Sequence, residues 1–213
     1  MCFKIEDLFK YNEEWVAKKL AMDENFFDKL VEGQSPQVLY IGCSDSRVTA
    51  ENIFGARPGD LFVHRNIANM VVEGDTNCMS VLTYALDHLK VKHVIVVGHY
   101  HCGGIEAAMA PGDLGVLNAW LVNIRNVYRL HQEELDAIED DHLRNGRLVE
   151  LNVVEQCINI TKTAVFQRAR IERNVELHAW VFDIHTGKVI DLEYDIEKFW
   201  KLAEPIYRLI DKV

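Results

Sequence analysis

The stretch "QVLYIGCSDSR", residues 37–47, indicates both the architecture of this chain and the place of its reactive side chains. Its first half is apolar on both faces, which is typical of a strand buried within a parallel sheet. The strand ends at Gly42, and a thiol, a carboxylate and a guanidinium then follow at alternate positions, in Cys43, Asp45 and Arg47. Because ligands of open α/β sheets bind beyond the carboxyl ends of the strands, we expect the chemistry of this protein where this strand ends.

A second stretch, "HVIVVGHYHCGG" at residues 93–104, has the same design. A run rich in β-branched residues ends at Gly98, and His99 and Cys102 follow with the spacing His-x-x-Cys. We expect both strands in one parallel sheet, so Cys43, His99 and Cys102 should emerge at the same edge.

Two thiolates and one imidazole form a ligand set that favours Zn²⁺. Three protein ligands are typical of a zinc site that keeps a fourth position open. Asp45 would take that position or face a bound water, and Arg47 would hold the Asp45 carboxylate in a bidentate pair. The sequence therefore predicts an open zinc site.

Other interpretations stay open on spacing alone. A single His-x-x-Cys is a weak signal, and the Asp and Arg could form a surface pair worth about 0–1 kcal/mol. Cys43 with His99 or His101 could be a nucleophilic pair, although that leaves Cys102 unexplained. A structural zinc site is a further alternative, but such sites usually have four Cys or His ligands. A dinucleotide site is disfavoured, because G-x-G-x-x-G does not follow the first strand.

The remaining sequence predicts a single α/β domain with an N-terminal helical arm over residues 1–32, broken around Asp23. Strands that are apolar throughout, separated by helices, indicate a mainly parallel central sheet covered by helices on both faces. "ELHAWVFDIH" and "VIDLEYD" predict a hairpin that adds an antiparallel edge strand. Further helices are expected over 49–54, 76–89, 115–138, 146–173 and 195–211, with one more starting near Gly104.

Composition narrows the class of protein. The 213 residues carry a formal net charge of −10, which argues against a nucleic-acid backbone as the main partner. No apolar run approaches the roughly 20 residues of a membrane-spanning helix. Charged residues near the N-terminus do not fit a signal peptide. We therefore expect a cytoplasmic protein without membrane or nucleic-acid partners.

Cysteines and histidines outside the two stretches show no ligand pattern. An odd number of cysteines is a poor disulfide framework, so Cys78 and Cys157 are expected to be buried packing residues and Cys2 incidental. The histidines expected to be structural or surface residues are His88, His93, His131, His142, His178 and His185.

The motifs "CSDSRV" (43–48), "FVHRNIAN" (62–69) and "GHYHCGG" (98–104) resemble those of the β-class carbonic anhydrases, and the resemblance covers about residues 23–185. It implies zinc ligands at Cys43, His99 and Cys102 and a catalytic dyad of Asp45 and Arg47. The implied reaction is the reversible hydration of CO2 to bicarbonate and a proton by a zinc-bound hydroxide. The two thiolates should offset the zinc charge, so activity is expected to rise on the alkaline side.

The resemblance also implies a substrate pocket. It would contain Gln34 from "GQSP", an apolar wall of Phe62 and Tyr84, and Gly103 beside the zinc. The family forms tight dimers, often paired into tetramers, with the pocket at the subunit interface. The N-terminal arm would then embrace a neighbouring subunit.

One subgroup of the family closes the site at low pH by moving this Asp onto zinc, and it has an accessory bicarbonate pocket of Trp, Arg and Tyr. Arg65 matches the Arg, but Tyr40 stands at the Trp position and Phe182 at the Tyr position. Phe182 cannot supply a hydroxyl, so the accessory pocket is not expected to be complete.

Two alternatives to CO2 hydration follow from the same residues. One is a related zinc enzyme that attacks CS2 or COS, and the other is a non-catalytic module that binds zinc or bicarbonate. The intact pair of Asp45 and Arg47 argues against the second.

Overall fold

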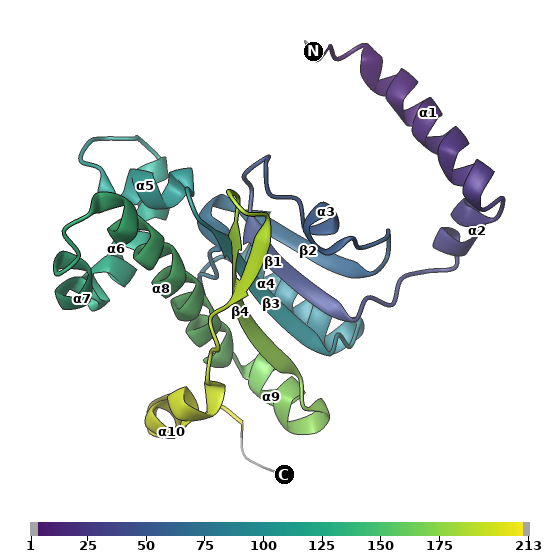
Figure 1. The fold of residues 1–213 in the computed structure, drawn as a ribbon. Helices are drawn as coiled ribbons and strands as arrows, with labels where there is room; N and C mark the ends of the chain where they lie inside the picture. Colours follow the sequence, from purple (N-terminus) through teal and green to yellow (C-terminus); the bar gives the residue numbers. More distant parts are fainter. Residues whose placement is uncertain (1–3, 211–213) are drawn as a thin grey trace. The chain divides into compact units, whose positions relative to one another are not determined.

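The computed structural model describes residues 4–210, so Cys2 lies outside the described residues. The chain divides into two units, residues 4–35 and residues 36–210 (Figure 1). The first unit holds α1 (Asp7–Met22) and α2 (Phe26–Val31), which confirms the predicted helices and their break. The N-cap of α2 is Asn25, whereas Asp23 ends α1 and accepts a hydrogen bond from the Asn25 amide at 3.1 Å.

The second unit is built on a five-stranded sheet with the order β2-β1-β3-β4-β5. Its strands are β1 (Val38–Cys43), β2 (Leu61–Asn66), β3 (His93–His99), β4 (Glu176–Asp183) and β5 (Lys188–Asp191). The first four strands pair in parallel, and β5 pairs antiparallel with β4 at the edge. The predicted mainly parallel sheet and its antiparallel edge are confirmed.

Most helices of this unit lie close to the predicted positions, but one begins at Asp141 rather than at 146, and two predicted helices are each divided. The predicted helix over 115–138 is divided at His131, and the one over 146–173 is divided at Lys162 and Thr163. The second division has a clear cause, because the Thr163 hydroxyl accepts from the Phe166 amide at 3.3 Å and so starts a new helix. The elements are α3 (Ala50–Phe54), η1 (Ile67–Asn69), α4 (Thr76–Thr83), the π-helical turn η2 (Tyr84–His88), α5 (Gly103–Met109), α6 (Leu117–Leu130), α7 (Gln132–Asp136), α8 (Asp141–Thr161), α9 (Ala164–Arg173) and α10 (Ile196–Tyr207).

The two faces of the sheet are covered unequally. Alternate residues of β1, β3 and β4, such as Leu39 and Ile41 of β1, join the main core with α4, α5, α6, α8 and α9. On the other face Tyr40 and Ile95 join a smaller cluster with Ala50 of α3. Figure 1 shows α8 along the first face and α3 on the other side. Within residues 4–210, no helix is long and apolar enough to cross a membrane.

Gly98 allows α8 to pack directly against the end of β3. A Cβ atom at this position would lie 2.5 Å from Val153 Cγ2 and 3.3 Å from Val149 Cγ1. Both valines are in the middle of α8 and are buried. Because Gly98 has no side chain, α8 packs directly on β3 at this position, and this contact fixes the strand one residue before His99.

Gly98→Ala should lower the free energy of unfolding by about 1–3 kcal/mol, because the added methyl group overpacks the contact with α8. Urea unfolding would measure the loss. Gly74→Ala is the matched control, since a Cβ at Gly74 would meet nothing within 4 Å, and its effect should stay within about 0.5 kcal/mol. Equal stability of the two variants would contradict this account of Gly98.

Candidate metal centre

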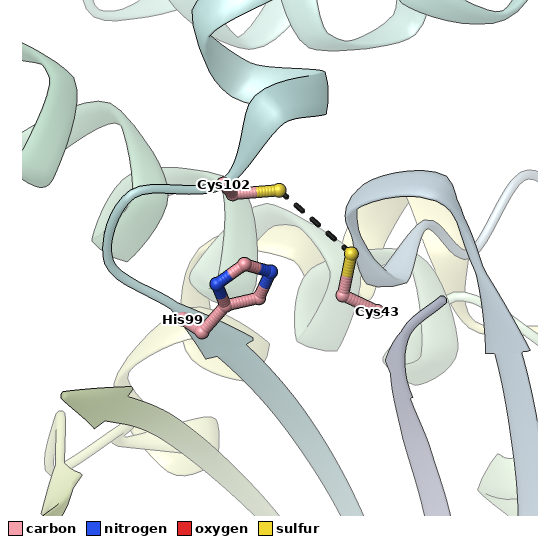
Figure 2. A group of neighbouring side chains, drawn as sticks. All are labelled: Cys43, His99 and Cys102. Atoms are coloured by element: carbon pink, nitrogen blue, oxygen red, sulfur yellow. Dashed lines mark hydrogen bonds between the residues drawn. The ribbon is translucent and has the colours of Figure 1, made fainter. Parts of the chain in front are cut away.

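Cys43, His99 and Cys102 meet at the carboxyl edge of the sheet (Figure 2). Cys43 is the last residue of β1 and His99 the last residue of β3, and these strands are parallel neighbours. The chain then turns sharply through His101, which has φ of 57°, and Cys102 is the N-cap residue of α5. The ligand atoms of the three residues lie within 4.8 Å of one another, as predicted.

The three side chains are buried and fit a shared cation. The Sγ atoms of Cys43 and Cys102 are 3.8 Å apart, whereas a disulfide requires about 2.05 Å. His99 Nδ1 donates to the carbonyl of Tyr100 at 3.0 Å, which leaves Nε2 as the ring nitrogen with a free lone pair. Nε2 is buried and has no hydrogen-bond partner among residues 4–210. Such an orphaned atom is costly, and a bound metal ion would satisfy it.

The two thiols ionise unequally because they lie so close together. The hydrogen bond from Cys102 lowers the pKa of Cys43, and the amides of Asp45 and Ala68 act in the same direction. The same hydrogen bond raises the pKa of Cys102, and burial adds to the rise. Ionisation of Cys43 therefore leaves the proton of Cys102 more tightly held. A divalent cation would displace that proton, because thiolates rather than thiols are metal ligands.

Asp45 and Arg47 form the predicted bidentate pair beside these ligands. Arg47 donates from Nε to Asp45 Oδ1 at 2.9 Å and from Nη2 to Oδ2 at 2.7 Å. Its Nη2 also donates to the carbonyl of His101 at 3.2 Å, which ties the loop after β1 to the turn after β3. Asp45 Oδ2 lies 3.9 Å from His99 Nε2. The carboxylate is thus held next to the candidate ligands.

Arg65 braces the loop that carries Cys43 and Asp45. Its Nε donates to the carbonyl of Cys43 at 2.8 Å, and its Nη2 donates to those of Asp45 at 2.6 Å and Val48 at 2.8 Å. These bonds occupy backbone acceptors that would otherwise lack partners in a loop. Sequence reasoning placed Arg65 only in an accessory pocket, and its role as a brace was missed.

The accessory bicarbonate pocket and the place of Gln34 in the substrate pocket remain predictions. Tyr40 and Phe182 belong to the same small cluster under α3, and the Tyr40 hydroxyl is buried without a hydrogen-bond partner among residues 4–210. Gln34 belongs to the N-terminal unit.

The predicted apolar wall does not lie at the metal centre of the same chain. Phe62 and Tyr84 do lie together, with ring centroids 5.7 Å apart. However, Phe62 pairs in register with Leu39, which is four residues before Cys43. Phe62 therefore lies about 13 Å from the level of Cys43, toward the amino-terminal ends of the strands. Gly103 directly follows Cys102 at the start of α5.

Two buried polar residues of α8 support the site and were not predicted. Asn152 Nδ2 donates to the carbonyl of Ala68 at 3.1 Å, and Gln156 Oε1 accepts from the Val71 amide at 2.8 Å. Gln156 Nε2 also donates to Asn152 Oδ1 at 3.1 Å. They hold the segment from which Ala68 supports the Cys43 thiolate. The available signal was a pair of amides four residues apart on an otherwise apolar helix face.

Comparisons with known proteins agree with this geometry. A family model described as carbonic anhydrase matches residues 38–189. A carbonic anhydrase of Emericella nidulans is 54% identical over 205 residues, which cover 96% of this chain and 90% of the relative.

Solved structures resemble the whole fold. One of two tetrameric β-carbonic anhydrases from Sordaria macrospora superposes with a TM-score of 0.86 at 42% identity, covering 88% of this chain and 96% of that chain. A β-carbonic anhydrase of Aspergillus fumigatus superposes with a TM-score of 0.91 at 35% identity, covering 96% of this chain and 99% of that chain.

Arg47→Gln should raise the pKa of Asp45 toward its ordinary value of 3.8, because the hydrogen bond from Arg47 is the main cause of its depression. Carboxyl carbon NMR titration would measure it. A carboxylate whose pKa is depressed in the folded state stabilises the fold above a pH of about 4. This contribution is lost as the pH falls through the pKa of the folded state. The variant should therefore lose stability less steeply in acid.

Arg57→Gln is the matched control, since Arg57 holds the exposed Asp60 in a similar local pair. It should raise the pKa of Asp60 and leave that of Asp45 unchanged. An Asp45 titration that is the same in wild type and Arg47→Gln would rule out the proposed control of this carboxylate.

Proposed function

The chain belongs to the β-class carbonic anhydrases, and on that premise we propose that it catalyses reversible CO2 hydration with zinc bound by Cys43, His99 and Cys102. One observation carries the proposal: two sulfur atoms and the orphaned Nε2 of His99 lie within 4.8 Å of one another. Two sulfurs with one imidazole nitrogen favour Zn²⁺ over Mg²⁺ or Ca²⁺. Three such ligands are the pattern of catalytic rather than structural zinc.

Zinc bound there would supply the Lewis acidity that makes water a nucleophile near neutral pH. Asp45 would direct the attack. Its pKa is held well below the usual range by Arg47, so the carboxylate stays ionised and can only accept hydrogen bonds. The Asp45 carboxylate, fixed beside the ligands, would accept a hydrogen bond from the O–H of the water-derived nucleophile. A lone pair of the nucleophile's oxygen would then face the carbon of CO2.

Arg47 would act as a positioning residue. It holds both carboxylate oxygens of Asp45 and the carbonyl of His101. Asp45 therefore has little freedom to rotate, and the orientation of its acceptor atoms is set before substrate arrives. The same contacts oppose a move of Asp45 onto the metal, so closure of the site would require the Arg47 pair to break.

We propose that self-association completes the substrate pocket. Phe62 and Tyr84 are too far along the sheet to wall the metal centre of their own chain. A second copy would bring this wall, and Gln34 with it, to the ligands. One of the two tetrameric β-carbonic anhydrases from Sordaria macrospora resembles this chain at 42% identity.

The N-terminal helices support the same proposal. α1 contains no buried residue, and its apolar side chains Phe9 and Trp15 are 81% and 40% exposed. Helices with exposed apolar side chains are stabilised mainly by packing against another surface. A neighbouring subunit would provide that surface for the arm.

A reducing compartment, such as the cytoplasm, suits this site. Two buried thiols only 3.8 Å apart are close enough to be oxidised to a disulfide after a small movement. Oxidation would remove both sulfur ligands at once. The cytoplasmic location therefore stays our prediction.

Asp45→Asn should keep zinc and lose CO2 hydration by about 100-fold or more, because the amide can donate where the carboxylate only accepts. His99→Ala should lose zinc and activity together. Stopped-flow hydration assays with zinc analysis of each protein would test both. Asp60→Asn, in an exposed surface turn, is the control and should resemble wild type. Full zinc content in His99→Ala would contradict the ligand assignment.

The rate of CO2 hydration should rise from acid to alkaline pH. The two thiolates carry two negative charges that offset those of a divalent cation, whereas neutral histidines offset none, so water at this site is acidified less. Initial hydration rates from about pH 6 to 9, at constant zinc content, would measure the profile. A profile flat across this range would refute the expectation.

A further inference from the structure

A second group of candidate ligands lies at the amino-terminal ends of β3 and β4, at the opposite end of the strands from Cys43 and His99. His93 is the first residue of β3, Glu176 is the first residue of β4, and His178 follows two positions later. β3 and β4 are parallel neighbours, with His93 paired to Glu176 and Ile95 to His178. His99 ends the same strand that His93 begins, so about 20 Å separates this group from the metal centre described above.

The three donor atoms are spaced as the ligands of one ion. His93 Nδ1 lies 3.2 Å from His178 Nε2 and 3.2 Å from Glu176 Oε2, and His178 Nε2 lies 3.6 Å from Glu176 Oε2. A triangle with these sides has its corners roughly 1.9 Å from a common centre, so an ion about 2.1 Å from all three atoms fits just outside its plane. The ion would sit on one side of the triangle, with further positions open to water.

The surroundings hold these side chains in place. The backbone of the group is fixed, because the His93 amide donates to the carbonyl of Gln37 and the Glu176 amide to that of Lys92. The His178 ring packs against Trp180 with centroids 5.3 Å apart. Ligands on rigid strands lose little entropy on binding an ion.

Protonation and access also suit a cation. Burial and the neighbouring His93 lower the pKa of His178, which favours the neutral imidazole that metals require. The side chains of His93, Glu176 and His178 are 38%, 53% and 27% exposed, so an ion can enter from solvent. Two imidazoles and one carboxylate suit Zn²⁺, Ni²⁺ and similar divalent ions rather than Ca²⁺ or Mg²⁺.

We propose that His93, Glu176 and His178 form a second metal site, which takes a divalent transition-metal ion and clamps the start of β3 to the start of β4. The site does not depend on the proposed enzymatic function. The histidines showed no ligand spacing in the sequence because they lie 85 positions apart, and only the strand pairing brings them together.

The test uses the full-length protein loaded with one zinc ion per chain, with Ni²⁺ as the probe. Equilibrium dialysis should show one Ni²⁺ bound per chain, while zinc analysis shows that the zinc content is unchanged. Glu176→Gln keeps the shape of the side chain and removes its charge, and His93→Gln removes a ring ligand. Each should weaken Ni²⁺ binding at least tenfold. His185→Gln is the control, since His185 is exposed and outside the group.

A stability measurement gives an independent readout. Ni²⁺ binds the folded clamp and should raise the thermal unfolding midpoint of wild type and His185→Gln, with little effect on Glu176→Gln. The proposal would be overturned if the protein that already holds zinc bound no Ni²⁺. Equal Ni²⁺ affinity of wild type, Glu176→Gln and His93→Gln would also overturn it. The CO2 hydration rate, measured on the same samples, tests the separate proposal about Cys43, His99 and Cys102.

Discussion

The parallel pairing of β1 with β3 sets where every side chain at the carboxyl ends of these strands can lie. In this register Gly42 is opposite Val97, and the next residues out of the sheet are Cys43 on one strand and Gly98 and His99 on the other. A slip of one residue would turn a strand's side chains to the other face. The ligand geometry is therefore set by hydrogen bonds along the whole length of both strands, and not by the loops alone.

Loops that leave the sheet need separate support, and polar side chains from distant elements provide it. Arg65 of β2 binds three carbonyls of the loop after β1, and Arg47 links that loop to the turn after β3. Asn152 and Gln156 of α8 hold the segment around Ala68 through hydrogen bonds to its backbone. The protein thus combines a rigid sheet with a small number of charged or amide braces around one edge.

The sequence was sufficient to predict the sheet, its antiparallel edge and the convergence of Cys43, His99 and Cys102, because apolar runs ending in glycine report directly on buried parallel strands. It was insufficient for features that depend on tertiary contacts. The division at Thr163 depends on one capping hydroxyl within a continuous helical pattern. The functions of Arg65 and Asn152 depend on backbone atoms far away in the chain, which no local pattern shows.

Burial of the Cys43, His99 and Cys102 group has a kinetic consequence. These residues are 5%, 0% and 1% exposed, so a bulky chelator would contact an ion held there only from the one side left open to water and substrate. Full release of the ion would then depend on local opening of the loops around the ligands as well as on the ligand bonds. Dilution into a strong chelator would then remove the ion at a pace set in part by protein motion, and binding strength alone would underestimate how long the protein stays loaded.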